Sequence, residues 1–113
     1  MGRISVKSAK AKGRNLQNLV AKKILEKFPD LLDDNDVKGC PMGSNGMDVQ
    51  LSNCARDIFP YAIECKARAA FSLYSICDQA TTNCEGLEPL LVLKGDRKQP
   101  LVVMDLDFFM EMI

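Results

Sequence analysis

Three short apolar segments limit what this chain can fold into. They cover residues 61–67, 89–94 and 100–104, and a proline stands at or just before the first residue of each. Apolar runs of this length, bounded by turn residues, are typical of buried β-strands. The polar residues 95–99 join the last two segments and favour a hairpin. The chain is therefore expected to be built around a sheet.

Helical periodicity appears between these segments. The first helix is predicted to begin after a cap at Asn15 and to stop at Pro29. Its apolar stripe, at spacings of three and four, consists of Leu16, Leu19, Val20, Ile24 and Phe28. A second helix is predicted over residues 72–83, and short helical segments are predicted over residues 52–59 and 105–113.

Two further strands are predicted near the middle of the chain. They cover residues 37–42 and 47–51 and flank the turn-rich residues 43–46. The predicted order is helix, three strands, helix, two strands. This order indicates a single α/β domain with a central mixed sheet flanked by helices.

The zero net charge of the 113 residues is the sum of two unlike segments. Residues 1–28 carry eight basic side chains against one glutamate, which gives +7, and residues 29–113 carry −7. We expect residues 1–13 to be a flexible basic arm and residues 14–113 to be the single folded domain. A basic segment of this density is suited to binding phosphates, although a solvated terminus is the alternative.

The chain contains no histidine, which excludes Ser-His-Asp and Cys-His nucleophiles, histidine general bases and histidine-ligated zinc. Catalysis would have to use carboxylates, lysine, hydroxyls, thiols or a hard metal ion. The five cysteines form no C-x-x-C pair and are expected to be reduced thiols of a cytoplasmic protein. No apolar stretch reaches the roughly 18 residues of a membrane span, and no secretory signal is apparent, so neither secretion nor membrane insertion is expected.

One set of side chains suggests chemistry. Asp48 opens a strand after a glycine-rich turn, and Glu64 and Lys66 share one face of the strand over residues 61–67. Pairing of these two strands would bring two carboxylates and one amine together. Carboxylate oxygens hold Mg²⁺, which activates water and polarises a phosphate, while a lysine stabilises charge. The set therefore favours metal-assisted phosphodiester hydrolysis, and the alternative is a cross-strand salt bridge.

Two strings carry a resemblance to a known family. Gly46-Met47-Asp48-Val49 followed by Ile63-Glu64-Cys65-Lys66 resembles the G-x-D...(D/E)-x-K signature of the PD-(D/E)xK nuclease superfamily. Within it, the chain is similar to the small Holliday-junction resolvases of archaea and phages. Those proteins share a basic arm leading into the first helix, as in residues 10–17, and a Ser-x-Gly-x-Asp turn, as in residues 44–48. The similarity spans roughly residues 10–105 and implies a restriction-endonuclease-like core.

The resemblance also implies roles for individual residues. Asp48 and Glu64 would be ligands of Mg²⁺, for which Mn²⁺ could substitute, the Cys65 backbone carbonyl would be a further ligand, and Lys66 would be the catalytic lysine. Gln17 stands where many relatives have a glutamate, and it either orients a metal-bound water or is a helix-surface glutamine.

Two other side chains have an implied role beside a structural alternative. Gln79 resembles a helix glutamine that some branches direct at the active site, and the alternative is again a surface residue. Ser44 either donates to a phosphate or shapes its turn.

The expected function is a Mg²⁺-dependent, structure-selective endonuclease that resolves four-way DNA junctions as a homodimer. The expected location is the cytoplasm, which is that of the host if the gene belongs to a phage, and a phage gene is favoured over a cellular one. Sequence-independent phosphate contacts are expected from Lys7, Lys10, Lys12 and Arg14. The apolar tail residues Phe108, Phe109, Met110 and Met112 either form the dimer surface or complete the core. A nicking or repair endonuclease acting on duplex, flap or other branched DNA is one alternative, and a non-catalytic DNA-binding module is another.

Overall fold

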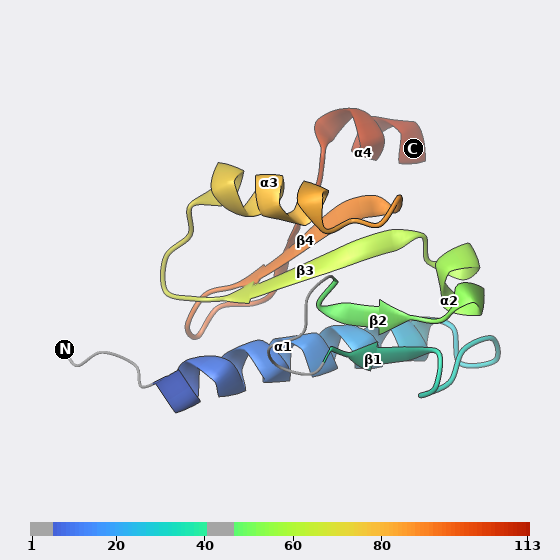
Figure 1. Ribbon diagram of the computed structural model, residues 1–113, viewed down its shortest axis with the longest axis horizontal. Coiled ribbons are helices and arrows are strands. Elements are labelled where there is room, and N and C mark those ends of the chain that lie inside the picture. The colour runs from blue at the N-terminus through green and yellow to red at the C-terminus, as the bar shows by residue number, and fades with distance from the viewer. Residues whose placement is uncertain (1–5, 41–46) are drawn as a thin grey trace.

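Strands β3 (Tyr61–Ala67) and β4 (Glu88–Lys94) lie parallel at the centre of the structure, a computed structural model that describes residues 6–40 and 47–113. Strand β5 (Leu101–Val103) pairs antiparallel with β4, so the larger sheet has the order β3-β4-β5 and is mixed. Strands β1 (Val37–Gly39) and β2 (Val49–Leu51) form a small antiparallel sheet, which lies beside β3 (Figure 1).

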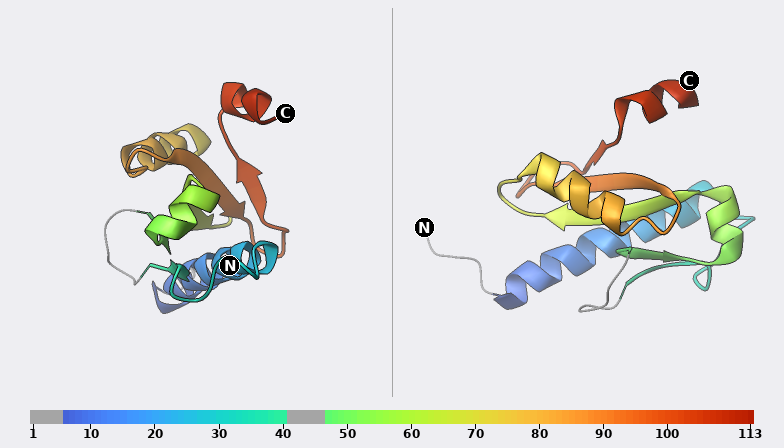
Figure 2. Two further views of the ribbon diagram at one scale, coloured as in Figure 1. Left: turned by 90° about the vertical axis from the view of Figure 1, so that its right-hand side faces the viewer. Right: turned by 45° about the horizontal axis from the view of Figure 1, so that its top comes forward.

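Helices α1 (Val6–Lys27) and α3 (Leu73–Thr82) cover opposite faces of the larger sheet (Figures 1 and 2). Alternate residues of β3 and β4 explain this arrangement, because successive side chains of a strand point to opposite faces. One apolar cluster joins α1 to the sheet through Leu16, Ile24, Ile63, Cys65, Leu90 and Val92. A second cluster joins α3 to the other face through Ile76, Leu91 and Leu93. Glu64 and Lys66 therefore belong to the face that α3 covers.

Two short helices complete the chain. Helix α2 (Asn53–Ile58) begins at Ser52, whose hydroxyl accepts a hydrogen bond from the Ala55 amide at 3.1 Å. Helix α4 (Leu106–Met112) begins at Asp105, which caps it in the same way. It lies at the periphery of the molecule (Figure 2), where the ring of Phe108 packs edge-on against Tyr61 of β3. None of the described helices is long and apolar enough to cross a membrane.

The first helix begins earlier than the sequence predicted. Helix α1 starts at Val6, not after Asn15, so residues 6–13, which were assigned to the basic arm, are helical. Alanine and lysine, which dominate residues 7–12, have high helix propensity and need no apolar stripe to continue a helix. Residues 1–5 lie outside the described residues.

The remaining elements follow the predicted order closely. The central strand has the predicted bounds of residues 61–67, and α3, β4 and β5 lie within one residue or two of their predicted bounds. Strands β1 and β2 are shorter than predicted, although residues 41–46 are outside the described part of the chain. The prediction of an α/β domain with a mixed sheet flanked by helices is confirmed.

Candidate active site

Asp48 connects the small sheet to the larger one. Its backbone amide donates a 3.0 Å hydrogen bond to the Ile63 carbonyl, and its carboxylate oxygen Oδ2 accepts a 2.7 Å bond from the Cys65 amide. The Asp48 carbonyl in turn accepts from the Cys40 amide at 2.8 Å. These bonds hold the carboxylate at the edge of β3. They stand in place of the predicted pairing of the two strands, because β2 and β3 belong to separate sheets.

The backbone of β3 is oriented so that Cys65 faces Asp48. At one end of the hydrogen-bond ladder between β3 and β4, the Glu88 amide donates to the Pro60 carbonyl. At the other end, the Arg68 amide donates to the Lys94 carbonyl. In parallel strands, the residues that bond to one neighbour alternate with residues whose N–H and C=O point to the other side. Even-numbered residues of β3 thus bond to β4, and the carbonyl of Cys65 points to the same edge as its amide.

Glu64 and Lys66 form an ion pair on the face covered by α3. The distance from Lys66 Nζ to Glu64 Oε1 is 3.4 Å, and the side chains are only 18% and 5% exposed. The Glu64 carboxylate also interacts through a hydrogen bond with the Asn83 side chain, at the C-terminal cap of α3. Lys66 thus does form a salt bridge, but the pair lies within one strand and is largely buried, whereas the alternative was an exposed pair between strands.

Both carboxylates are held where negative charge is costly. Burial raises the pKa of Asp48, although the Cys65 amide and the Lys66 charge act in the opposite direction. Burial also raises the pKa of Glu64, and the nearby charge of Asp48 raises it further. Desolvation disfavours a carboxylate, and two of them close together disfavour each other. A cation bound between them would remove this penalty, which makes the pair a chemically suitable ligand set for a divalent ion.

Gln17 is buried rather than on the helix surface. Its side chain is 9% exposed, and its oxygen Oε1 has no hydrogen-bond partner among the described residues. It lies against Gly39 of β1, where a Cβ atom would stand 3.5 Å from Gln17 Oε1 and only 2.8 Å from Asn18 Oδ1. Gly39 directly precedes Cys40, whose amide bonds to the Asp48 carbonyl, so the unsatisfied oxygen lies near the end of β1 that adjoins the aspartate. A buried acceptor without a partner is expected to bind water or an ion.

Helix α3 contributes a residue that the sequence analysis missed. Asn83 contacts Glu64, whereas the predicted Gln79 is exposed and lies one helical turn earlier on the same side of α3. The four-residue spacing from Gln79 to Asn83 was the signal that could have identified Asn83.

The predicted DNA contacts do not form one group. Lys7, Lys10 and Arg14 are exposed and share one face of α1, since they are spaced by three and four residues. Lys12 lies on another side of the helix and pairs with Asp96. Ser44 falls outside the described residues.

No protein-family profile, curated protein or solved structure matches this chain. Within residues 6–40 and 47–113, no group of three or more cysteine, aspartate or glutamate side chains could hold a metal ion. The candidate site therefore rests on two carboxylates, one backbone carbonyl, one lysine and one buried amide.

Proposed function

We propose that this chain is a Mg²⁺-dependent endonuclease of the PD-(D/E)xK type, with a restriction-endonuclease-like core, that resolves four-way DNA junctions. The observation that carries the proposal is the bond between the Asp48 carboxylate and the Cys65 amide, which brings the aspartate to the strand that presents Glu64 and Lys66. Both the spacing of these residues in the sequence and their proximity in the structure support the proposal.

Asp48, Glu64 and the Cys65 carbonyl would hold the Mg²⁺, or Mn²⁺ in its place. Carboxylate and carbonyl oxygens are the ligands that such hard cations prefer. The ion would supply an activated water and a polarised phosphate. Gln17 contributes a neutral oxygen, which suits it to orient water better than to bind the cation directly.

Lys66 is positioned by Glu64 in a largely buried environment. Its ammonium donates hydrogen bonds there to the nucleophilic water or to the phosphate oxygens. Electrostatic stabilisation by a positioned charge is strong where water is excluded.

DNA would be held through its phosphates. The exposed cations Lys7, Lys10 and Arg14 of α1 form a row that can follow a phosphate backbone without reading the base sequence. Such contacts make binding steeply dependent on salt concentration.

A homodimer would place two such sites symmetrically, as paired cuts in a four-way junction require. Several apolar side chains are exposed on β5 and α4 and support such an interface: Leu101, Val102, Leu106, Phe109, Met110, Met112 and Ile113.

Cleavage assays on defined DNA structures test the proposal. A mobile junction, a fixed junction, a flap, a nicked duplex and a linear duplex are compared with and without Mg²⁺. We expect paired nicks in the junctions, and loss of cutting with retained junction binding in Asp48→Asn and Lys66→Ala. Asp57→Asn and Lys22→Ala, which remove exposed charges elsewhere, should cut normally.

Other outcomes would contradict specific parts of the proposal. Preference for flap or linear duplex would replace the resolvase by a nicking or repair nuclease. Junction binding without cutting in Mg²⁺ or Mn²⁺ would indicate a non-catalytic DNA-binding module. Normal cutting by Asp48→Asn or Lys66→Ala would refute the assigned site.

A further inference from the structure

A basic cleft lies at the carboxyl ends of β3 and β4, outside the candidate active site. It has a volume of about 500 Å³ and lies between the first half of α1 and the turn that joins β4 to β5. Its charged lining residues are Lys12, Lys94, Asp96 and Arg97. Three cations thus surround one carboxylate.

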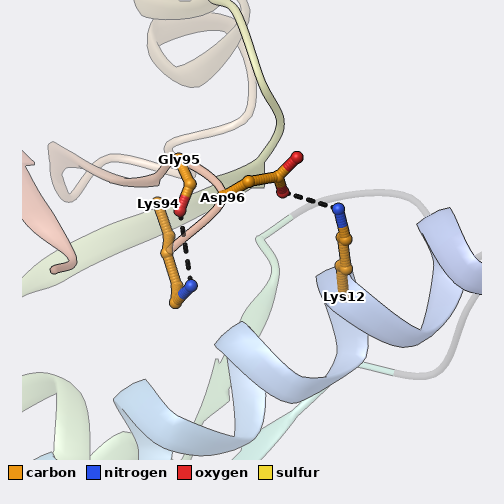
Figure 3. A network of polar contacts seen from close by, with 4 residues as sticks. All are labelled: Lys12, Lys94, Gly95 and Asp96. Atoms are coloured by element: carbon orange, nitrogen blue, oxygen red, sulfur yellow. Dashed lines mark hydrogen bonds and ion pairs between the residues drawn. The ribbon is translucent and has the colours of Figure 1, made fainter. Parts of the chain in front are cut away.

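The carboxylate of Asp96 pairs with one of these cations. Its Oδ1 atom lies 2.5 Å from Lys12 Nζ, and Figure 3 shows the two side chains reaching toward each other from α1 and the turn. The hydrogen bond from Lys12 lowers the pKa of Asp96 most, and the charges of Lys94 and Arg97 lower it further. Asp96 thus pairs directly with Lys12, whereas Lys94 Nζ lies 3.4 Å from the Gly95 carbonyl oxygen, to which it donates (Figure 3).

Backbone features hold the turn in this arrangement. Arg97 adopts a left-handed conformation with φ of 59°, which is uncommon for a residue with a side chain. The Lys98 amide closes the turn by donating to the Gly95 carbonyl at 3.1 Å. Gly95 leaves room for the stem of Lys98, because a Cβ atom there would stand 3.1 Å from Lys98 Cγ. The cations are thus presented by a defined turn.

We propose that this cleft binds a phosphodiester group of the DNA backbone, and that Asp96 occupies the anion position until the DNA phosphate displaces it from Lys12. The inference rests on the proposed function and extends it. Ala67 lines the cleft and directly follows Lys66, so the cleft adjoins the end of β3 that carries the catalytic lysine. A DNA strand that passes the active site can therefore reach the cleft around the end of the sheet. Lys12 is thereby separated in role from Lys7, Lys10 and Arg14, which face another side of α1.

Removal of the competing carboxylate should strengthen DNA binding. Fluorescence anisotropy with a labelled four-way junction is measured over a salt series, with the full chain in EDTA so that no cutting occurs. Asp96→Asn should bind about two- to fivefold more tightly at about 0.1 M salt, because the phosphate no longer has to break the ion pair between Asp96 and Lys12. The salt slope should stay that of the parent, because Lys12 contacts a phosphate in both complexes. Lys12→Ala should make the salt slope shallower by about 0.9 than that of either the parent or Asp96→Asn, because one phosphate contact is lost.

Two controls separate this effect from a general change in charge. Asp57→Asn removes an exposed carboxylate on α2. It measures the increase in junction affinity that comes from the loss of one negative charge alone. The double variant Lys12→Ala with Asp96→Asn should lose the gain of Asp96→Asn, because the freed lysine is absent. Thermal unfolding of each variant checks that it is folded, and Lys12→Gln replaces Lys12→Ala if the latter unfolds.

The outcomes distinguish this inference from the proposed function. Junction binding by the parent chain, with Asp96→Asn no tighter than Asp57→Asn, would overturn the inference and leave the proposed function standing. A gain from Asp96→Asn that persists fully without Lys12 would also overturn it. Absence of junction binding by the parent chain would overturn both.

Discussion

The Oδ2 atom of Asp48 lies 2.7 Å from the backbone nitrogen of Cys65 and accepts its hydrogen bond. One carboxylate therefore joins β2 to β3 and is also a proposed metal ligand. Its structural and chemical roles can be separated by substitution.

Asp48→Ala should lower the free energy of unfolding by about 1–3 kcal/mol, because it leaves the amide of the buried Cys65 without an acceptor. Asp48→Asn retains an acceptor oxygen and removes the cost of burying a charge, so it should be at least as stable as the parent. Urea unfolding of the metal-free proteins measures the difference. Equal stability of the two variants would show that the bond contributes nothing.

Glu64→Gln should stabilise the metal-free protein at neutral pH. The pKa of Glu64 is raised in the folded state, mainly by burial, so the folded protein binds this proton more tightly than the unfolded chain does. The associated stability is fully present below the unfolded pKa and is lost as pH rises through the folded pKa. The parent chain should therefore lose stability as pH rises across this window, and Glu64→Gln should lose less.

Urea unfolding in EDTA from about pH 4 to about pH 8 measures this dependence. Glu111→Gln, which removes an exposed carboxylate from α4, is the matched control and should follow the parent. A Glu64→Gln curve with the same pH dependence as the parent would contradict the assigned cause.

Gln17→Glu should increase the affinity for Mn²⁺ and reduce the stability of the metal-free protein. The new carboxylate would be buried beside the site, where its charge is costly until a cation binds. Compared with the parent, Gln17→Glu should unfold at a lower temperature without Mn²⁺, and its unfolding temperature should rise more when Mn²⁺ is added. Gln50→Glu, at an exposed position of β2, should change neither. An unchanged response to Mn²⁺ would place Gln17 outside the metal environment.

Charged substitutions in α4 should convert the proposed dimer to monomers. Phe109 and Met110 are exposed, and glutamate at both positions would place charge in an apolar interface. Sedimentation velocity measures the change in mass. Leu31→Glu alters another exposed apolar residue and should leave the dimer intact. A double variant that still dimerises would move the interface elsewhere.

The local sequence was sufficient to predict the central strand. The run from Tyr61 to Ala67 is bounded by a proline, and its period of two places Glu64 and Lys66 on one face whatever surrounds them. The start of α1 could not be predicted from an apolar stripe, because residues 6–13 carry none. Part of what fixes that end of the helix is an ion pair with Asp96, 84 residues away in the sequence.

Only the part of the site that lies within one strand was predictable from the local sequence. The pairing of Glu64 with Lys66 follows from strand geometry, whereas the contact of Asp48 with Cys65 depends on how two separate sheets meet. The contribution of Asn83 depends on where α3 ends over the sheet. These are tertiary relationships, and no local pattern encodes them.

The ion pair between Lys12 and Asp96 also sets an order for biosynthesis. Its two members are separated by most of the chain, so the pair cannot form on the ribosome until the turn between β4 and β5 has been made. Until then the first turns of α1 have no partner there, and their lysines are free to meet any polyanion nearby. A newly made chain would thus meet nucleic acid with Lys12 still unpaired, and the finished protein has this charge neutralised.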